Sequence, residues 1–448
     1  MRLRPRSQPL PAAILSIFAL ASTAAAETLT YGVDAGIAET DNVTLAETDK
    51  VSQTMAIANA DFDFKQQSRR LDADVKGNFT YIDYLQGAFS NQLVGRFDGI
   101  AHVALIPERL TWALQDNFGQ AGVDPFTPLT PTNLENVNTV STGPDLTLRL
   151  GGTSFLNMGA RVSRAQYETS PFDSNRLSGN IAWGLQLSAL SSASLNADTE
   201  RVRFDNTVLN TDFDRTSAFA RYETRGARTE LSADLGATKI RESDASTTGG
   251  LAKIELSRKI SPAATLNFSI GHDLTDASAS FSSLRSGALG VVGTAPAAQT
   301  SQSYTDNYAS AEWRYQRNRT TIAISGRWEK DVYDKQPSFD NTRGGAEFLA
   351  ERQLTHSLAA QLWGRLYKTN YAHTVVTPPN GSSDYSDALI AAGLAWHHGH
   401  GLEVRLRCEH SSRTTTGGGG AGFEQNRVLL TVGYRPKPRV DGEPDSGV

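Results

Sequence analysis

The run DNFGQAGVDPFTPLTPTNLENVNTVSTGPD fills residues 116–145 and interrupts a chain that otherwise alternates apolar and polar residues. Three prolines close together in it, Pro125, Pro128 and Pro131, remove backbone donors and bar a helix or a central strand there. Residues 110–114 (LTWAL) alternate before the run, and residues 146–150 (LTLRL) alternate after it. The run therefore predicts a long connection between two strands.

Period-two alternation extends along the rest of the chain. In residues 71–81 (LDADVKGNFTY) every second residue is apolar or glycine, and the residues between them are polar. Successive side chains of a strand point to opposite faces, so each such segment has one apolar and one polar face. The segments often exceed ten residues, whereas strands of soluble sheets average about 5–6.

The connections between these segments alternate in length. Short ones at 67–69, 107–109 and 151–152 are interleaved with long ones at 39–50, 119–136 and 278–302. Short periplasmic turns alternating with long outer loops are typical of outer-membrane barrels, and an open sheet edge is not tolerated in lipid. The pattern predicts an all-β fold, a transmembrane antiparallel up-and-down β-barrel of about 18–20 strands with both termini periplasmic.

The two ends of the chain show processing and assembly signals. Arginines at 2, 4 and 6, an apolar segment at 10–20 and Ala24–Ala26 predict a signal peptide at residues 1–26. The barrel is expected over residues 27–435, and residues 436–448 are expected to form a periplasmic tail. Residues 426–434 (NRVLLTVGY) resemble the terminal strand that the barrel assembly machinery recognises, although here a tail follows it.

Three segments carry a family resemblance: residues 31–44 (YGVDAGIAETDNVT), residues 112–120, and the proline-rich segment 125–146. They are similar to the EpsL-like outer-membrane β-barrels associated with exopolysaccharide export and the exosortase/PEP-CTERM system. The resemblance implies outer-membrane lipid, the assembly machinery, a polysaccharide and periplasmic export components as partners. It implies no catalytic residues and no cofactor.

The apolar series is expected to face lipid, with Tyr31, Trp112, Trp183 and Trp328 near the membrane interfaces. The polar series is expected to line the interior, where acids of early strands oppose arginines of later ones. That arrangement predicts either a field across the lumen or charge pairing within the wall. The candidate solute pathway comprises Asp61, Asp63, Asp72, Asp74, Arg96, Arg161, Arg327, Trp363, Arg365, Tyr367, Arg405 and Arg407. The candidate constriction loop comprises Pro125, Pro128, Pro131 and Asn133.

Other chemistry is not favoured by the sequence. The net charge of −5 gives no basic excess for nucleic acid, and Cys408, the single cysteine, has no partner for an internal disulfide. The histidines at 397, 398, 400 and 410 fit a solvated turn better than a metal site, and no nucleophile motif occurs. We expect no enzyme activity and no metal, but a passive conduit or docking barrel for exopolysaccharide export. A general diffusion porin and a non-conducting structural or adhesin-like barrel remain the alternatives.

Overall fold

The period-two segments fold as strands of 12 to 16 residues. The computed structural model describes residues 26–277, 279, 302–372, 384–399, 401–415 and 422–436. Its elements are β1 (Ala26–Thr40), β2 (Gln53–Gln67), β3 (Leu71–Tyr84), β4 (Gln92–Ile106), β5 (Leu110–Gly122), η1 (Pro131–Asn133), β6 (Leu134–Arg149), β7 (Ser154–Tyr167), β8 (Ser174–Gln186), β9 (Ser191–Phe204), β10 (Phe213–Arg225), β11 (Thr229–Glu242), β12 (Ser246–Ser261), β13 (Ala264–Asp276), β14 (Ser303–Arg317), β15 (Thr320–Tyr333), η2 (Pro337–Phe339), β16 (Asn341–Gln353), β17 (Leu358–Tyr371), β18 (Tyr385–His398), β19 (Leu402–Thr415) and β20 (Phe423–Tyr434).

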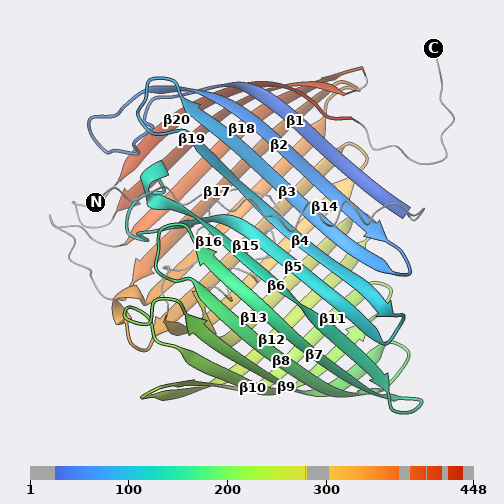
Figure 1. Ribbon diagram of the computed structural model, residues 1–448. Helices are drawn as coiled ribbons and strands as arrows, with labels where there is room; N and C mark the ends of the chain where they lie inside the picture. The colour runs from blue at the N-terminus through green and yellow to red at the C-terminus, as the bar shows by residue number, and fades with distance from the viewer. Residues whose placement is uncertain are drawn as a thin grey trace.

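Each strand pairs antiparallel with its neighbours in sequence, and β1 pairs with β20, so twenty strands close into a barrel (Figure 1). This confirms the predicted fold class. The closing seam is short: β1 pairs with β2 along its whole length, but with β20 only from Val33 to Thr40. No helix among the described residues is long and apolar enough to cross a membrane.

Apart from the three-residue turn 243–245, the connections at one end of the barrel are longer than those at the other end, where β1 starts and β20 ends. One boundary differs from the sequence-based prediction. Asp116–Gly122 belongs to β5 and the segment from Leu134 belongs to β6, so the proline-rich loop spans only residues 123–133. Alternation is lost there because polar residues occupy both faces of β5, as suits a strand that continues beyond the hydrocarbon layer.

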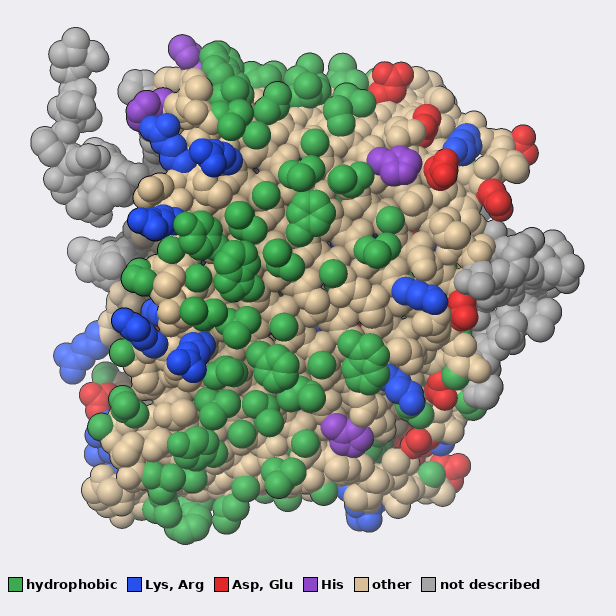
Figure 2. All heavy atoms as spheres, turned by 180° about the vertical axis from the view of Figure 1, so that it is seen from behind, with side chains coloured by type: hydrophobic (Ala, Val, Ile, Leu, Met, Phe, Trp, Pro, Cys, Tyr) green, Lys and Arg blue, Asp and Glu red, His purple; other side chains and the backbone are tan. Residues whose placement is uncertain are grey.

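The apolar series faces outward. Tyr31, Trp112, Trp183 and Trp328 are each between 41 and 46% exposed in the isolated chain. Figure 2 shows hydrophobic side chains spread over the middle of the outer wall, with charged side chains mostly near the two ends. A transmembrane barrel has this distribution, with an apolar band outside and polar side chains within. The protein therefore has the architecture of an outer-membrane β-barrel.

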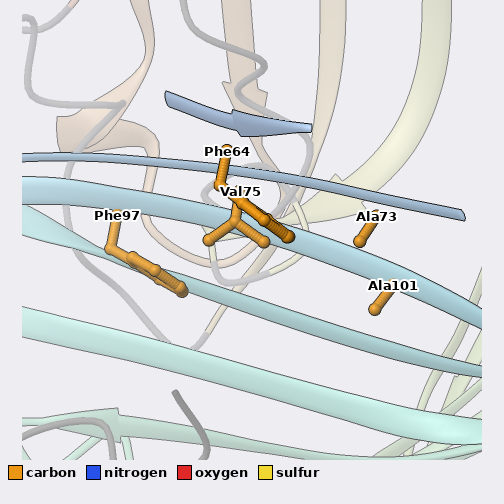
Figure 3. Close-up of a cluster of buried hydrophobic side chains, with 5 residues drawn as sticks. All are labelled: Phe64, Ala73, Val75, Phe97 and Ala101. Carbon is orange, nitrogen blue, oxygen red and sulfur yellow. The ribbon is translucent and has the colours of Figure 1, made fainter. Parts of the chain in front are cut away.

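On the outward-facing apolar series, a buried cluster joins β2, β3 and β4. It consists of Phe64, Ala73, Val75, Phe97 and Ala101 (Figure 3). Glycines make room for the rings. A Cβ atom at Gly77 would lie 2.5 Å from the Phe62 ring, and one at Gly99 would lie 2.9 Å from the Phe97 ring. Glycine in these strands therefore allows aromatic side chains to lie flat across the neighbouring backbone.

Several predicted features lie outside the described residues. They are the signal peptide up to residue 25, His400, and the tail from residue 437 onward.

Candidate solute pathway

The strand register places all twelve candidate pathway residues on the inner face. Asp61 lies opposite Gly32 on β1, and Gly32 alternates with the exposed Tyr31 and Val33. Trp363, Arg365 and Tyr367 alternate in β17 with the exposed Leu362 and Leu366. Their position facing the lumen is a property of the fold, and a role in solute passage remains a prediction.

The acids of the early strands are paired within the wall. Asp63 lies 3.9 Å from Lys65, Asp74 lies 3.4 Å from Lys76, and Arg96 Nε donates to Asp98 at 2.6 Å. Asp61 accepts from Arg435, just after β20, at 2.5 Å, and the guanidinium passes over Gly32. Asp61 therefore ties β2 to the end of the chain across the closing seam.

The arginines of the later strands are paired in the same way. Arg161 donates to Asp145 at 2.5 Å, Arg327 to Glu329 at 2.8 Å, and Arg407 lies 2.7 Å from Glu409. Arg405 pairs with Glu403. Carboxylates thus accompany these guanidiniums on their own side of the barrel, and this geometry favours charge pairing within the wall over a field across the lumen.

The two aromatic residues among the candidate pathway residues, Trp363 and Tyr367, differ in access, which matters for stacking against a sugar ring. Trp363 is only 4% exposed, and the guanidinium carbons of Arg365 and Arg407 lie 5.8 and 5.6 Å from its ring centre. Tyr367 is half-buried, with Arg343 4.9 Å from its ring centre and its hydroxyl donating to Glu347 at 3.0 Å. Both rings have an arginine near their face, but Trp363 is almost fully buried, so a sugar ring has more access to Tyr367.

Asn133 holds the 123–133 loop in shape. Its Oδ1 accepts from the Asp124 amide at 2.7 Å, and its Nδ2 donates to the Asp124 carbonyl at 2.9 Å and to Thr127 Oγ1 at 2.8 Å. Pro131 begins η1, and its carbonyl oxygen accepts from Gln92 Nε2 in β4 at 3.0 Å. One buried amide and three prolines thus give the loop a fixed conformation.

This loop reaches the opposite wall. Phe126 stacks on Phe339 of η2 with ring centres 6.0 Å apart and 9° between planes, and lies 4.8 Å from Tyr371 at the end of β17. Since β5 and β6 lie about half-way round the ring from β16, the loop crosses the mouth of the barrel at its long-loop end. The candidate constriction loop is therefore placed where it can narrow the opening.

The segment between β15 and β16, which contains Phe339 and is called the platform below, is held by two further contacts. Phe339 also packs edge-on against Tyr333, and Lys335 pairs with Glu242 at the end of β11. The hydrogen bond to the Glu242 carboxylate is the main reason that the pKa of Lys335 is raised above its usual value. The segment between β15 and β16 is thus held from two sides.

The outer end of β13 is a second segment that extends across the lumen. Leu274 is 1% exposed and packs with Val202, Phe213 and Ile240, which are inward residues of β9, β10 and β11. Asp276, the last residue of β13, accepts hydrogen bonds from Arg176 in β8. The outer end of β13 therefore bends into the lumen. No local pattern in the sequence predicts this bend.

Charge is divided along the barrel axis. The short turns contain Arg69, Arg70, Arg109, Arg228 and Arg319 against the single acid Glu108, and these five exposed arginines are called the basic rim below. The described loops at the other end contain only Lys50 and Lys335 as bases, beside the acids Asp41, Glu47, Asp49, Asp124, Glu168, Asp173, Asp205, Asp212, Asp244, Asp334, Asp340 and Asp384. The same charge difference can be read from the sequence once each connection is assigned to its end of the barrel.

The described histidines near the predicted turn do not converge. His397 lies 2.6 Å from Glu403, His398 stacks on Trp396, and His410 shares a hydrogen bond with Asn426. Each ring therefore has its own partner, which fits the expectation of a turn more closely than a metal site.

Comparison with protein-family models and with curated proteins finds no match. Among solved structures, the FrpB iron transporter from Neisseria meningitidis is 10% identical with a TM-score of 0.42, over 91% of this chain and 82% of that one. A mutant of the ferric enterobactin receptor PfeA from Pseudomonas aeruginosa is 10% identical with a TM-score of 0.44, over 91% and 80%. OccK11 (OpdR) from Pseudomonas aeruginosa is 11% identical with a TM-score of 0.33, over 92% and 96%. The assignment as an outer-membrane barrel rests on the strand order, register and faces described above.

Proposed function

We propose that this protein is a passive conduit for an exopolysaccharide crossing the outer membrane, with the short-turn end in the periplasm and no enzymatic step. The observation that carries the proposal is the basic rim. Exposed guanidiniums attract carboxylates and bind them with paired hydrogen bonds. An acidic polysaccharide arriving from the periplasm would therefore be drawn to the barrel at that end.

The paired charges of the lumen wall support passage of a polymer rather than its retention. Its arginines are already neutralised by neighbouring carboxylates, as at Arg161–Asp145 and Arg407–Glu409. Conduction needs attraction strong enough for entry and weak enough for release. A wall of paired charges and hydroxyl groups meets that need for a long polar chain.

The structure at the long-loop end supports a channel whose opening is narrowed while no polymer passes through it. A barrel of this strand number is wide, since barrels of about 16–18 strands already leave an aqueous channel. Phe126 holds the 123–133 loop across that opening through two ring contacts. Such contacts add only about 0.5–1.5 kcal/mol each beyond area burial, so an emerging polymer could displace them.

The resemblance of residues 31–44, 112–120 and 125–146 to EpsL-like barrels supports the choice of exopolysaccharide over other acidic polymers. A general diffusion porin shares the same fold and remains the second candidate. It would pass neutral and acidic oligosaccharides alike and would not depend on the basic rim.

Single-channel recording in a planar bilayer tests the proposal. Oligogalacturonate added at the short-turn side should block the current transiently, and block frequency should fall between about 0.1 and 1 M salt as the screening length shortens. The triple variant Arg70→Gln, Arg228→Gln, Arg319→Gln should lose these blocks. The pair Arg201→Gln, Arg203→Gln near the opposite end is the matched control and should keep them.

Equal blocking by neutral maltooligosaccharides, unaffected by the triple variant, would favour the general porin. A folded barrel with no current steps would favour a structural role. In cells, deletion of the gene should leave polymer synthesis intact and reduce surface polymer. Normal surface polymer in the deletion strain would contradict export.

A further inference from the structure

Three carboxylates meet on the inner wall near the long-loop end. Asp306 of β14 lies directly opposite Asp331 of β15 in the register, and Glu329 lies two residues before Asp331 on the same face. One carboxylate oxygen from each of the three lies within 4.8 Å of those of the other two. Like charges this close repel unless something positive lies between them.

Two of these carboxylates have a buried oxygen that no described group satisfies. Asp331 is 1% exposed; its Oδ2 accepts from Asn341 Nδ2 at 3.3 Å, and its Oδ1 has no hydrogen-bond partner among the described residues. Oδ1 of Asp306 is buried in the same way. Burying an anionic oxygen without a partner is strongly unfavourable, so these atoms indicate a ligand of positive charge.

The charged groups around the cluster do not supply that ligand. Arg327 Nε donates to Glu329 at 2.8 Å. Lys253 lies 2.7 Å from Asp273, which faces Asp306 from β13. Arg343 faces Glu329 from β16, and its guanidinium lies over the Tyr367 ring.

Among the described residues, Arg327 and Lys253 therefore form their ion pairs with Glu329 and Asp273 and not with Asp306 or Asp331. The two negative charges of Asp306 and Asp331 match the charge of one divalent cation.

We propose that Asp306, Glu329 and Asp331 bind one calcium ion. Ca²⁺ prefers carboxylate and amide oxygens at about 2.3–2.6 Å in flexible geometry, so two of its ligands lie no more than about 5 Å apart. The spacing within 4.8 Å meets this limit without movement of the backbone. Mg²⁺ requires a tighter octahedron and keeps its waters, so it fits this strand-borne set less well.

The ion would fix the outer ends of β14 and β15 against each other. Tyr333 follows Asp331 by two residues, and it packs against Phe339 of η2, on which Phe126 rests. Calcium would thus stiffen the platform that receives the 123–133 loop. This inference concerns the cation alone and does not depend on what passes through the barrel.

Calorimetric titration of the folded, EDTA-stripped barrel with CaCl₂ alone tests the site. We expect saturable binding with one ion per chain and a Tm that rises with calcium concentration, because a ligand of the folded state stabilises it. Asp331→Asn and Asp306→Asn should each abolish both responses. Asp98→Asn is the matched control, since Asp98 is another inward acid, paired with Arg96 on β4, and it should retain them.

Terbium binding gives an independent readout, with Tyr308, opposite Glu329, as the donor of its sensitised emission. Heat-modifiable gel mobility shows whether each variant is folded, and Glu329→Gln serves if either aspartate variant is not. The proposal is overturned if the wild type binds no calcium, or if Asp331→Asn binds it equally well. It is also overturned if Asp331→Asn raises Tm in EDTA while the wild type ignores calcium, because a shared proton would then hold the cluster.

Discussion

Oδ1 of Asp276 accepts a hydrogen bond from Nη2 of Arg176 at 2.5 Å, although the two residues are 100 positions apart in the sequence. β9 to β12 lie between their strands in the sheet. Arg215 lies 3.5 Å from the same aspartate and 2.5 Å from Glu200. This ion-pair network therefore holds the end of β13 inside the barrel and reduces the open cross-section there.

Replacing Asp276 with Asn should destabilise the folded barrel by about 3–5 kcal/mol, because Arg176 would keep a buried charge without its main partner. Urea unfolding in lipid vesicles measures the change. Asp214→Asn, which removes an exposed pair with Arg203, should cost no more than about 1 kcal/mol. Similar losses for both variants would contradict the buried network.

Replacing Phe126 with Ala should raise single-channel conductance, since the 123–133 loop would lose both ring contacts with the opposite wall. Stability should fall little, as each aromatic pair contributes about 0.5–1.5 kcal/mol beyond area burial. Phe89→Ala is the control, because Phe89 packs edge-on against Tyr84 on its own side of the mouth. Unchanged conductance in Phe126→Ala would show that the loop does not limit the current.

The orientation of the faces can be tested with adjacent residues of β8. Ile181 lies outward near the middle of the strand, and Ala182 lies inward. Ile181→Arg should cost about 2–4 kcal/mol at mid-bilayer and Ala182→Arg clearly less. Leu185 lies near the short-turn end of β8, so Leu185→Arg should cost only about 0–1 kcal/mol. Folding yield in vesicles decides, and equal damage at 181 and 182 would mean that the register is wrong.

Cys408 provides a native probe of the outer wall. It is exposed, and its neighbours in alternation on β19 include the outward Leu406. A nitroxide attached there should be more accessible to oxygen than to a water-soluble nickel complex, because oxygen concentrates in lipid. The same label at Ser411→Cys, on the inward series of β19, in a chain that also carries Cys408→Ala, should show the opposite preference.

The fold could be predicted from the sequence because each strand carries its own two-sided pattern. Residues 71–81 alternate without reference to any distant part of the chain, and loop lengths alternate in the same local way. The alternation is lost at Asp116–Gly122, where β5 has polar residues on both faces. Polar side chains on both faces of a strand leave no apolar period to detect.

The site was less accessible to such reasoning because its main contacts are long-range. Alternation placed Trp363 on the inner face, but only the structure brings Arg365 and Arg407 against its ring. Similarly, nothing local links Phe126 with Phe339, or Asp276 with Arg176. The sequence left open a field across the lumen or charge pairing within the wall, and the contacts favour pairing, because cross-strand partners depend on register.

The short seam between β1 and β20 determines the order in which the barrel can be completed. β1 finds its other partner, β2, next to it in the sequence, but must wait for residues 427–434 to arrive from the far end of the chain. Until then both edges of a nineteen-strand sheet would carry unpaired backbone groups, which other chains could pair with. Because this pairing is short, β1 and β20 are expected to separate before other neighbouring strands when the barrel opens. The ion pair between Arg435 and Asp61 stabilises this junction.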